Sequence, residues 1–159
     1  MLTIHGTGSA NGADDANAVE GQKGILANST GNGDNSKTLV NFGTLIVYDV
    51  TINNSTASFS VWNSNNGESN MELHNCLIER GEPDIIAVVN SGTLLLDGCT
   101  IHGGGDLTHP VLLQNAGNAT VKLINTKISN SGNGYSLYRE SGNIETDAAS
   151  DCPNAYGVE

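Results

Sequence analysis

The residues most capable of chemistry lie in one short turn, Glu79-Arg-Gly-Glu-Pro-Asp84, which brings the carboxylates of Glu79, Glu82 and Asp84 near a guanidinium. Clustered carboxylates can bind calcium, and pairs of them act as acid, base or nucleophile in glycoside hydrolysis. A catalytic face built from repeats would place carboxylates at matching positions of successive copies. The matching positions of the repeat described below are Asn53-Asn54, His102-Gly103 and Ser129-Asn130. We therefore interpret the cluster as a solvated polar turn and assign no catalytic residue.

The histidines and cysteines do not form a motif for a metal or a cofactor. The four histidines are scattered through the chain, without the spacing of a zinc-binding motif. Three cysteines are an odd set, unlike the paired framework of a small disulfide-rich domain. We interpret Cys76 and Cys99 as part of a buried apolar ladder, with a disulfide or a metal pair as the alternatives, and Cys152 as an exposed or capping thiol. No cofactor and no metal ligand are expected.

A nine-residue phrase occurs four times in the sequence, and this repeat indicates the kind of fold that positions these side chains. Its copies end at isoleucines that are 26, 23 and 27 residues apart, and a period of this length is typical of a stacked solenoid. The copies are Thr44-Leu-Ile-Val-Tyr-Asp-Val-Thr-Ile52, Asn70-Met-Glu-Leu-His-Asn-Cys-Leu-Ile78, Thr93-Leu-Leu-Leu-Asp-Gly-Cys-Thr-Ile101 and Thr120-Val-Lys-Leu-Ile-Asn-Thr-Lys-Ile128.

Apolar residues alternate within each phrase, which predicts a strand with one buried face. A residue that tolerates turn or left-handed geometry follows at Asp49, Asn75, Gly98 and Asn125, so a bend should separate two short strands in every copy. Equivalent inward residues should stack as ladders in the core. The predicted core ladder is Ile52, Ile78, Ile101, Ile128, Leu45, Met71, Leu94, Val121, Cys76 and Cys99.

A third apolar segment precedes each phrase and ends in a turn, as in Thr38-Leu-Val-Asn-Phe-Gly43 and Ala87-Val-Val-Asn-Ser-Gly92. Three short strands per repeat predict an all-β protein: a short right-handed parallel β-helix of about four to five rungs, with irregular N- and C-terminal caps. Residues 1–37 are expected to form an arm or cap with one irregular rung as an alternative, residues 38–142 the β-helix, and residues 143–159 a C-terminal cap or tail.

The phrase Val89-Asn-Ser-Gly-Thr-Leu-Leu-Leu-Asp-Gly-Cys-Thr-Ile101 resembles the rungs of the right-handed parallel β-helix superfamily, the pectate-lyase-like proteins. Phage tailspike and decoration proteins and bacterial surface adhesins share this architecture. The resemblance covers roughly residues 38–142 and implies an architecture rather than an activity. Some enzymes of this class cleave acidic polysaccharides with clustered carboxylates, so a lyase or hydrolase using Glu79, Glu82 and Asp84 stays an alternative.

The amino-acid composition limits which kinds of partner the chain can bind. The net charge of -11, with six Lys and Arg in total, argues against nucleic-acid binding, which requires clustered basic residues. No apolar run reaches the 18 residues of a membrane span, so no membrane insertion is expected. Aromatic residues are 4% and charged residues 14% of the chain, which favours β-structure with many polar turns over a charged disordered tail.

The predicted contact surface lies on the outward positions of the repeat. Tyr48, His74, Asp97 and Ile124 occupy one such position in successive copies, where an exposed Tyr and Ile would mark a subunit, particle or sugar contact. The apolar pair Ile25-Leu26 in the N-terminal segment is the further candidate for docking.

The sequence thus favours a non-enzymatic structural or interaction module. A start without a signal peptide, a fold that needs no disulfide and an acidic, chemically bland solenoid together favour a virion-associated protein, such as a bacteriophage capsid decoration or tail-fibre component. By resemblance we expect a homotrimer on the virion surface, docked on a capsid or other particle protein. A fragment of a bacterial cell-surface adhesin, located outside the cell, is the other non-enzymatic alternative.

Overall fold

The structure is a computed structural model that describes residues 2–5, 24–27, 37–54, 59–64, 69–80, 86–106, 110–113 and 119–156. Within these ranges the chain forms sixteen β-strands and no helix. The strands belong to three sheets, called A, B and C here, and every pairing between neighbouring strands is parallel. The all-β class and the stacked parallel architecture are therefore confirmed.

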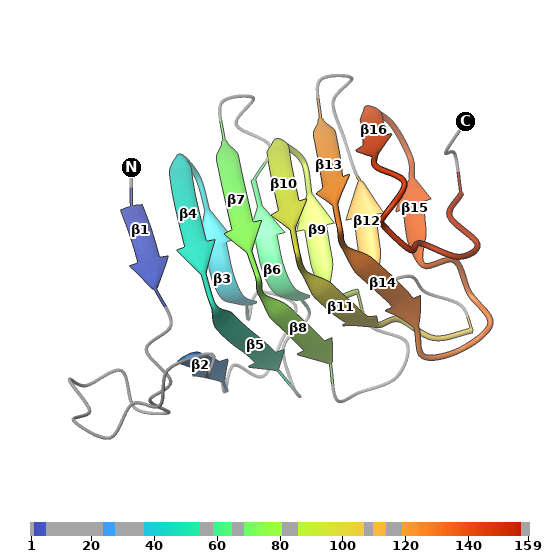
Figure 1. The fold of residues 1–159 in the computed structure, drawn as a ribbon, viewed down its shortest axis with the longest axis horizontal. Helices are drawn as coiled ribbons and strands as arrows, with labels where there is room; N and C mark the ends of the chain where they lie inside the picture. The colour runs from blue at the N-terminus through green and yellow to red at the C-terminus, as the bar shows by residue number, and fades with distance from the viewer. Residues whose placement is uncertain are drawn as a thin grey trace.

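The chain visits the three sheets in turn and returns to each one a layer further along, as the colours of Figure 1 show. Sheet A contains β1 (Leu2–His5), β4 (Thr44–Tyr48), β7 (Asn70–His74), β10 (Thr93–Asp97), β13 (Thr120–Ile124) and β16 (Asn143–Thr146). Sheet B contains β2 (Gly24–Ala27), β5 (Val50–Asn54), β8 (Leu77–Arg80), β11 (Thr100–Gly103) and β14 (Lys127–Asn130). Sheet C contains β3 (Lys37–Asn41), β6 (Phe59–Asn63), β9 (Val88–Asn90), β12 (Val111–Leu113) and β15 (Leu137–Arg139).

One apolar core runs through the layers, because alternate residues of every sheet point inward. The four isoleucines that close the nine-residue phrases pair in register on sheet B and are each at most 1% exposed. Sheet A supplies two further inward rows in the same way. The inward residues of those rows are Leu45, Met71, Leu94 and Val121, and Val47, Leu73, Leu96 and Leu123.

A left-handed residue makes the bend between sheets A and B, as the phrase predicted. Asp49, Asn75, Gly98 and Asn125 have φ of 56, 51, 63 and 44°. Asn and Asp tolerate this conformation better than other residues with a side chain, and Gly adopts it freely. Backbone hydrogen bonds connect successive bends, because Asn75 N–H donates to Asp97 O at 2.8 Å and Gly98 N–H to Ile124 O at 2.9 Å.

Cys76, Cys99 and Thr126 follow these bends and are buried side by side, one per layer. Each uses its S–H or O–H to donate to backbone carbonyls: Cys99 to Leu73 at 3.2 Å, and Thr126 to Leu96 at 2.9 Å. Hydrogen bonding to Cys76 and burial raise the pKa of the Cys99 thiol, so this cysteine stays protonated. Both cysteines are free thiols, and the ladder is structural.

A buried asparagine ladder makes the turn from sheet C back to sheet A. Asn41 Nδ2 donates to Asn63 Oδ1, and Asn63 Nδ2 donates to Asn90 Oδ1, both at 2.8 Å. The same amides donate to backbone carbonyls at the start of sheet A, as Asn63 does to Thr93 O at 2.9 Å. Buried amides need hydrogen-bond partners. The three asparagine side chains bond to one another and also to the backbone next to the turns.

The final segment forms one more coil. After β16 pairs with β13, Asp151 forms a parallel bridge to Lys127 on sheet B, and Tyr156 forms one to Tyr138 on sheet C. Residues 143–156 therefore contact all three sheets. At the other end, β1 and β2 belong to sheets A and B, while most of residues 1–37 lie outside the described ranges.

Candidate functional site

The outward row of sheet A contains the contact residues proposed from the sequence, and it is internally paired. Tyr48, His74, Asp97 and Ile124 lie in register on neighbouring strands. The Tyr48 and His74 rings stack, with centroids 4.7 Å apart and planes 14° apart. His74 Nδ1 lies 3.2 Å from Asp97 Oδ2, and Nε2 lies 3.2 Å from Glu72 Oε2.

This arrangement leaves His74 poorly placed for catalysis. Both ring nitrogens face carboxylates of the protein, and the side chain is 20% exposed. A general base needs a ring nitrogen within reach of a substrate proton. The described residues hold no group of three or more His, Cys, Asp or Glu side chains arranged to bind a metal. The outward side chains of sheet A are therefore held by contacts with one another.

The outward row of sheet B contains the one member of the carboxylate cluster that the structure describes. Glu79 lies in register with His102, which lies in register with Ser129. His102 Nδ1 is 2.8 Å from Ser129 Oγ, a contact between two exposed side chains at matching positions of the repeat. Glu82 and Asp84 lie outside the described residues, as do the side chains of Ile25 and Leu26, although those two residues belong to β2.

The outward row of sheet C is apolar from the first layer to the last, and the repeat did not predict it. Val40 is 37% exposed, and Phe42 just beyond it is 58% exposed. Val89, at the centre, is buried although it points away from the core. We call this row, by its register, the sheet C row: Val40, Trp62, Val89, Leu112, Tyr138 and Tyr156.

Aromatic rings gather at the two ends of the sheet C row. Phe42 and Trp62 meet edge to face, with centroids 5.7 Å apart. At the other end Tyr138 stacks on Tyr156 at 4.7 Å and 8°, and Tyr135 lies 5.2 Å from Tyr156. Tyr135 and Tyr156 are 45% and 46% exposed. Exposed aromatic groups of this kind are typical of contact surfaces, because the rings bury a large apolar area while their hydroxyls stay hydrated.

A signal for the sheet C row does exist in the sequence. Its strands contain apolar pairs, such as Leu39-Val40, Val61-Trp62, Val88-Val89 and Leu137-Tyr138. A strand with one wet face should alternate apolar and polar residues, and a strand covered on both faces should not. The paired pattern indicates a second apolar face, but the polar residue that follows each pair, Asn41, Asn63, Asn90 or Arg139, concealed it.

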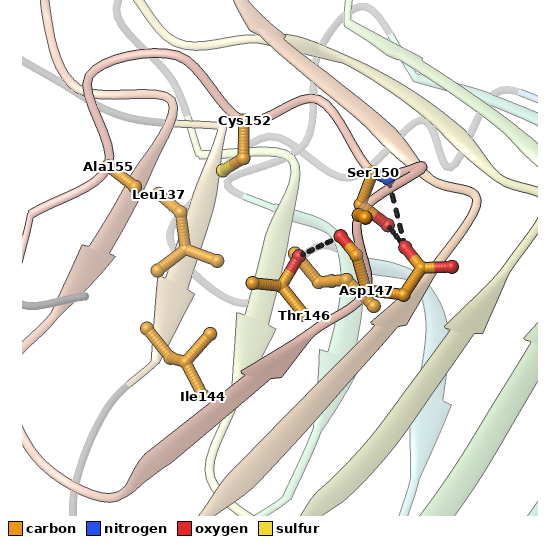
Figure 2. A pocket seen from close by; sticks show the side chains of 9 residues that line it. Leu137, Ile144, Thr146, Asp147, Ser150, Cys152 and Ala155 are labelled. Carbon is orange, nitrogen blue, oxygen red and sulfur yellow. Dashed lines mark hydrogen bonds between the residues drawn. The ribbon is translucent and has the colours of Figure 1, made fainter. Parts of the chain in front are cut away.

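A cavity of about 210 Å³ lies at the C-terminal end of the core (Figure 2). It exists because the last coil places small residues over large ones. Thr146 pairs with Leu123, and the bridges of Asp151 and Tyr156 put Cys152 beside Ile128 and Ala155 beside Leu137. Leu123, Leu137 and Ile144 line its apolar side, and Thr146, Asp147 and Ser150 line its polar side.

The polar groups at this cavity are already bonded. Asp147 accepts hydrogen bonds from Ser150 Oγ at 2.6 Å and from the backbone N–H of Asn125 at 3.1 Å, and these bonds, the Ser150 hydroxyl first, lower the pKa of Asp147. Burial raises the pKa of the Cys152 thiol, which lies 3.2 Å from Ser136 Oγ. A protonated, half-buried thiol is a poor nucleophile, so Cys152 is poorly placed to react.

Comparison with protein families, curated proteins and solved structures gives no match to this chain. In the described part of the chain, no helix is long and apolar enough to span a membrane.

Proposed function

We propose that this chain is a non-enzymatic interaction module that attaches to an assembled particle through the outer face of sheet C. The single observation that carries the proposal is the sheet C row, which is apolar in every layer and has exposed aromatic rings at both ends. Val89 at its centre is buried, so the exposed apolar and aromatic groups lie at the two ends of the row, and groups of this kind are typical of surfaces that bind a partner. Aromatic anchors of this type dominate the binding energy of protein interfaces.

The finer proposal is a virion-associated β-helix of the pectate-lyase-like class, such as a bacteriophage capsid decoration or tail-fibre protein, acting as a homotrimer on the virion surface. It is supported by the stacked parallel sheets, which form a stiff scaffold, and by the acidity of the chain. With a net charge of -11, the chain is attracted to a basic particle surface and repelled by nucleic acid.

Sheet C is a better docking face than sheet A. On sheet A the outward positions mix apolar residues, such as Ile46, Leu95 and Ile124, with Thr, Asn and charged residues. The charged residues are held in place, because His74 contacts both Glu72 and Asp97. Contact with a partner would require these charges to lose water. On sheet C, contact removes apolar surface from water instead, which is favourable at about 25 cal/mol per Å².

The experiment is co-sedimentation of the chain with candidate phage particles or cell envelopes. Trp62→Ala should weaken binding about tenfold or more, as loss of an interface anchor does. The matched control is Tyr48→Ala, which removes a stacked ring from sheet A and should bind like the unmodified chain. Equal loss in the two variants, or no loss in either, would reject sheet C as the docking face. Retention by cell envelopes alone would favour the adhesin alternative.

A glycan is the second candidate partner, because of the three tyrosines at the end of sheet C. Their centroids lie 4.7 to 6.0 Å apart, and such rings can stack on the apolar faces of sugars. Glycan-array binding that is lost in Tyr135→Ala would support this candidate. A depolymerisation assay on acidic glycans, with and without calcium, tests the lyase or hydrolase alternative, and activity lost in Glu79→Gln would establish it.

A further inference from the structure

Two strands lie at the ends of sheet A, β1 at one end and β16 at the other, and in the described structure each pairs with only one strand. On β16, Asn143 N–H donates to Ala119 O and, just after the strand, Asp147 N–H donates to Leu123 O. Alternate residues of a strand face the same neighbour. The N–H groups of Ile144 and Thr146 therefore face away from β13, toward the free edge. Such an edge is a template for another parallel strand.

The core is also incomplete at this end. The last coil places Thr146, Cys152 and Ala155 where the preceding layer has Leu123, Ile128 and Leu137, and a cavity of about 210 Å³ remains (Figure 2). A cavity of about 150 Å³ already admits benzene. The cavity is therefore large enough for an aliphatic side chain.

The opposite end presents such side chains. On β1, Leu2 pairs with Leu45 and Ile4 pairs with Val47, so both occupy inward positions of the core. Ile4 is partly buried against the core, whereas Leu2 is 61% exposed. An inward-facing leucine that is largely exposed lacks a covering layer.

We propose that copies of this chain stack end to end, with β1 of one copy pairing in parallel with β16 of the next. The same register that places Ile144 on Val121 would place Leu2 on Ile144 and Ile4 on Thr146. The two aliphatic side chains would then cover the cavity, and the N–H groups of the β16 edge would gain carbonyl partners. The interface joins two different ends, so assembly is open and gives linear stacks.

This inference is independent of the proposed function, because it uses the ends of the solenoid rather than the outer face of sheet C. The two ideas also predict different sizes. A lateral trimer is a closed species of fixed mass, whereas end-to-end stacks grow with concentration. Repulsion between copies that each have a net charge of -11 opposes stacking, so added salt should lengthen the stacks.

Sedimentation velocity of the full chain between micromolar and millimolar concentration is the test, with negative-stain electron microscopy of the largest species. We expect the mean mass to rise steadily with concentration and salt. Sheet A has six strands, so the axial repeat should be about 29 Å at about 4.8 Å per layer. A single species over the whole range overturns the proposal.

Two variants test the contact itself. Leu2→Asp should weaken association about tenfold or more, because its carboxylate would be placed on Ile144, at the apolar side of the cavity. Thr3→Asn is the control: Thr3 is exposed on the same strand and would lie beside Glu145 of the next copy, so a neutral polar side chain should leave stacking intact. Ala155→Leu fills the cavity from within and should also weaken stacking about tenfold without lowering the melting temperature. Stacking of Leu2→Asp and Ala155→Leu at the unmodified level rejects the proposed interface.

Discussion

The outer faces of sheets A and C belong to the same coils, yet their chemistry differs. On sheet A single apolar residues such as Ile46, Leu95 and Ile124 stand among Thr, Asn and charged groups, and His74 bonds to Glu72 and Asp97. On sheet C the outward row is apolar in every layer. Both sheets have the same parallel pairing and the same apolar inward rows. The fold therefore requires apolar residues at the inward positions and allows many residue types at the outward ones. The outer faces are for this reason the part of a solenoid from which its function can be inferred.

The largest effect should separate inward from outward residues of one strand. Leu94→Ala removes a fully buried side chain and should lower the free energy of unfolding by about 2–5 kcal/mol, because it leaves a cavity between layers. Leu95→Ala, on the outer face of sheet A, should cost about 1 kcal/mol or less. Urea denaturation measures both. Equal losses would mean that the inward and outward faces are not energetically distinct.

The second prediction concerns the asparagine ladder that joins sheet C to sheet A. Asn63→Ala leaves the amide of Asn41 and the carbonyl oxygen of Asn90 without their ladder partner, so the free energy of unfolding should fall by about 1–3 kcal/mol. Asn70→Ala, at an outward position of β7, is the control and should change it by about 0.5 kcal/mol at most. If the two variants unfold at the same urea concentration, the ladder contributes no more than a surface amide.

The sequence was sufficient for the fold because the inward positions repeat. Every closing isoleucine and every left-handed bend is visible in the nine-residue phrase, and the structure places them at matching points of successive layers. The candidate surface was harder to identify. Tyr48 and Ile124 were singled out because sheet A alternates clearly, while the sheet C row shows no alternation to reveal which residue of each apolar pair is outward.

Contacts of the last coil escaped prediction for a physical reason. His102 and Ser129 stand at matching positions of the nine-residue repeat, so their contact follows from it. Cys152 lies outside the repeat, yet the bridge between Lys127 and Asp151 places it beside Ile128. The register of the last coil is therefore a property of the folded stack, because no copy of the phrase marks it in the sequence.

A third, smaller effect compares the stacked rings of the two faces. The Tyr48–His74 pair on sheet A and the Tyr138–Tyr156 pair on sheet C both have centroids 4.7 Å apart. Tyr48→Ala and Tyr156→Ala should each lower the free energy of unfolding by about 0.5–1.5 kcal/mol beyond the loss of buried area. Particle binding should fall only in Tyr156→Ala. Binding that falls in step with stability in both variants would contradict a special role for sheet C.

The smallest expected effect is the pH dependence of the stability of the last coil, which contributes to both sheet A and sheet C. Hydrogen bonds lower the pKa of Asp147 below its ordinary value of 3.8, so its stabilising effect is complete above that value and is lost as the pH falls through the lower folded-state pKa. The protection factors of the Asn125 and Ser150 amides, which compare their exchange rates with the intrinsic rate at each pH, should therefore fall in acid. In Asp147→Asn, protection should be lower at neutral pH and show less of this acid dependence. Identical pH profiles in the two proteins would exclude Asp147 as the cause.

The most direct test of the central claim is hydroxyl-radical footprinting of the chain bound to its particle, read by mass spectrometry, because the two faces then report from one molecule. The account predicts that oxidation of Phe42, Trp62, Tyr135 and Tyr156 falls strongly on binding, while that of Tyr48 and His74 is unchanged. Protection of Tyr48 and His74 with sheet C still exposed would contradict it.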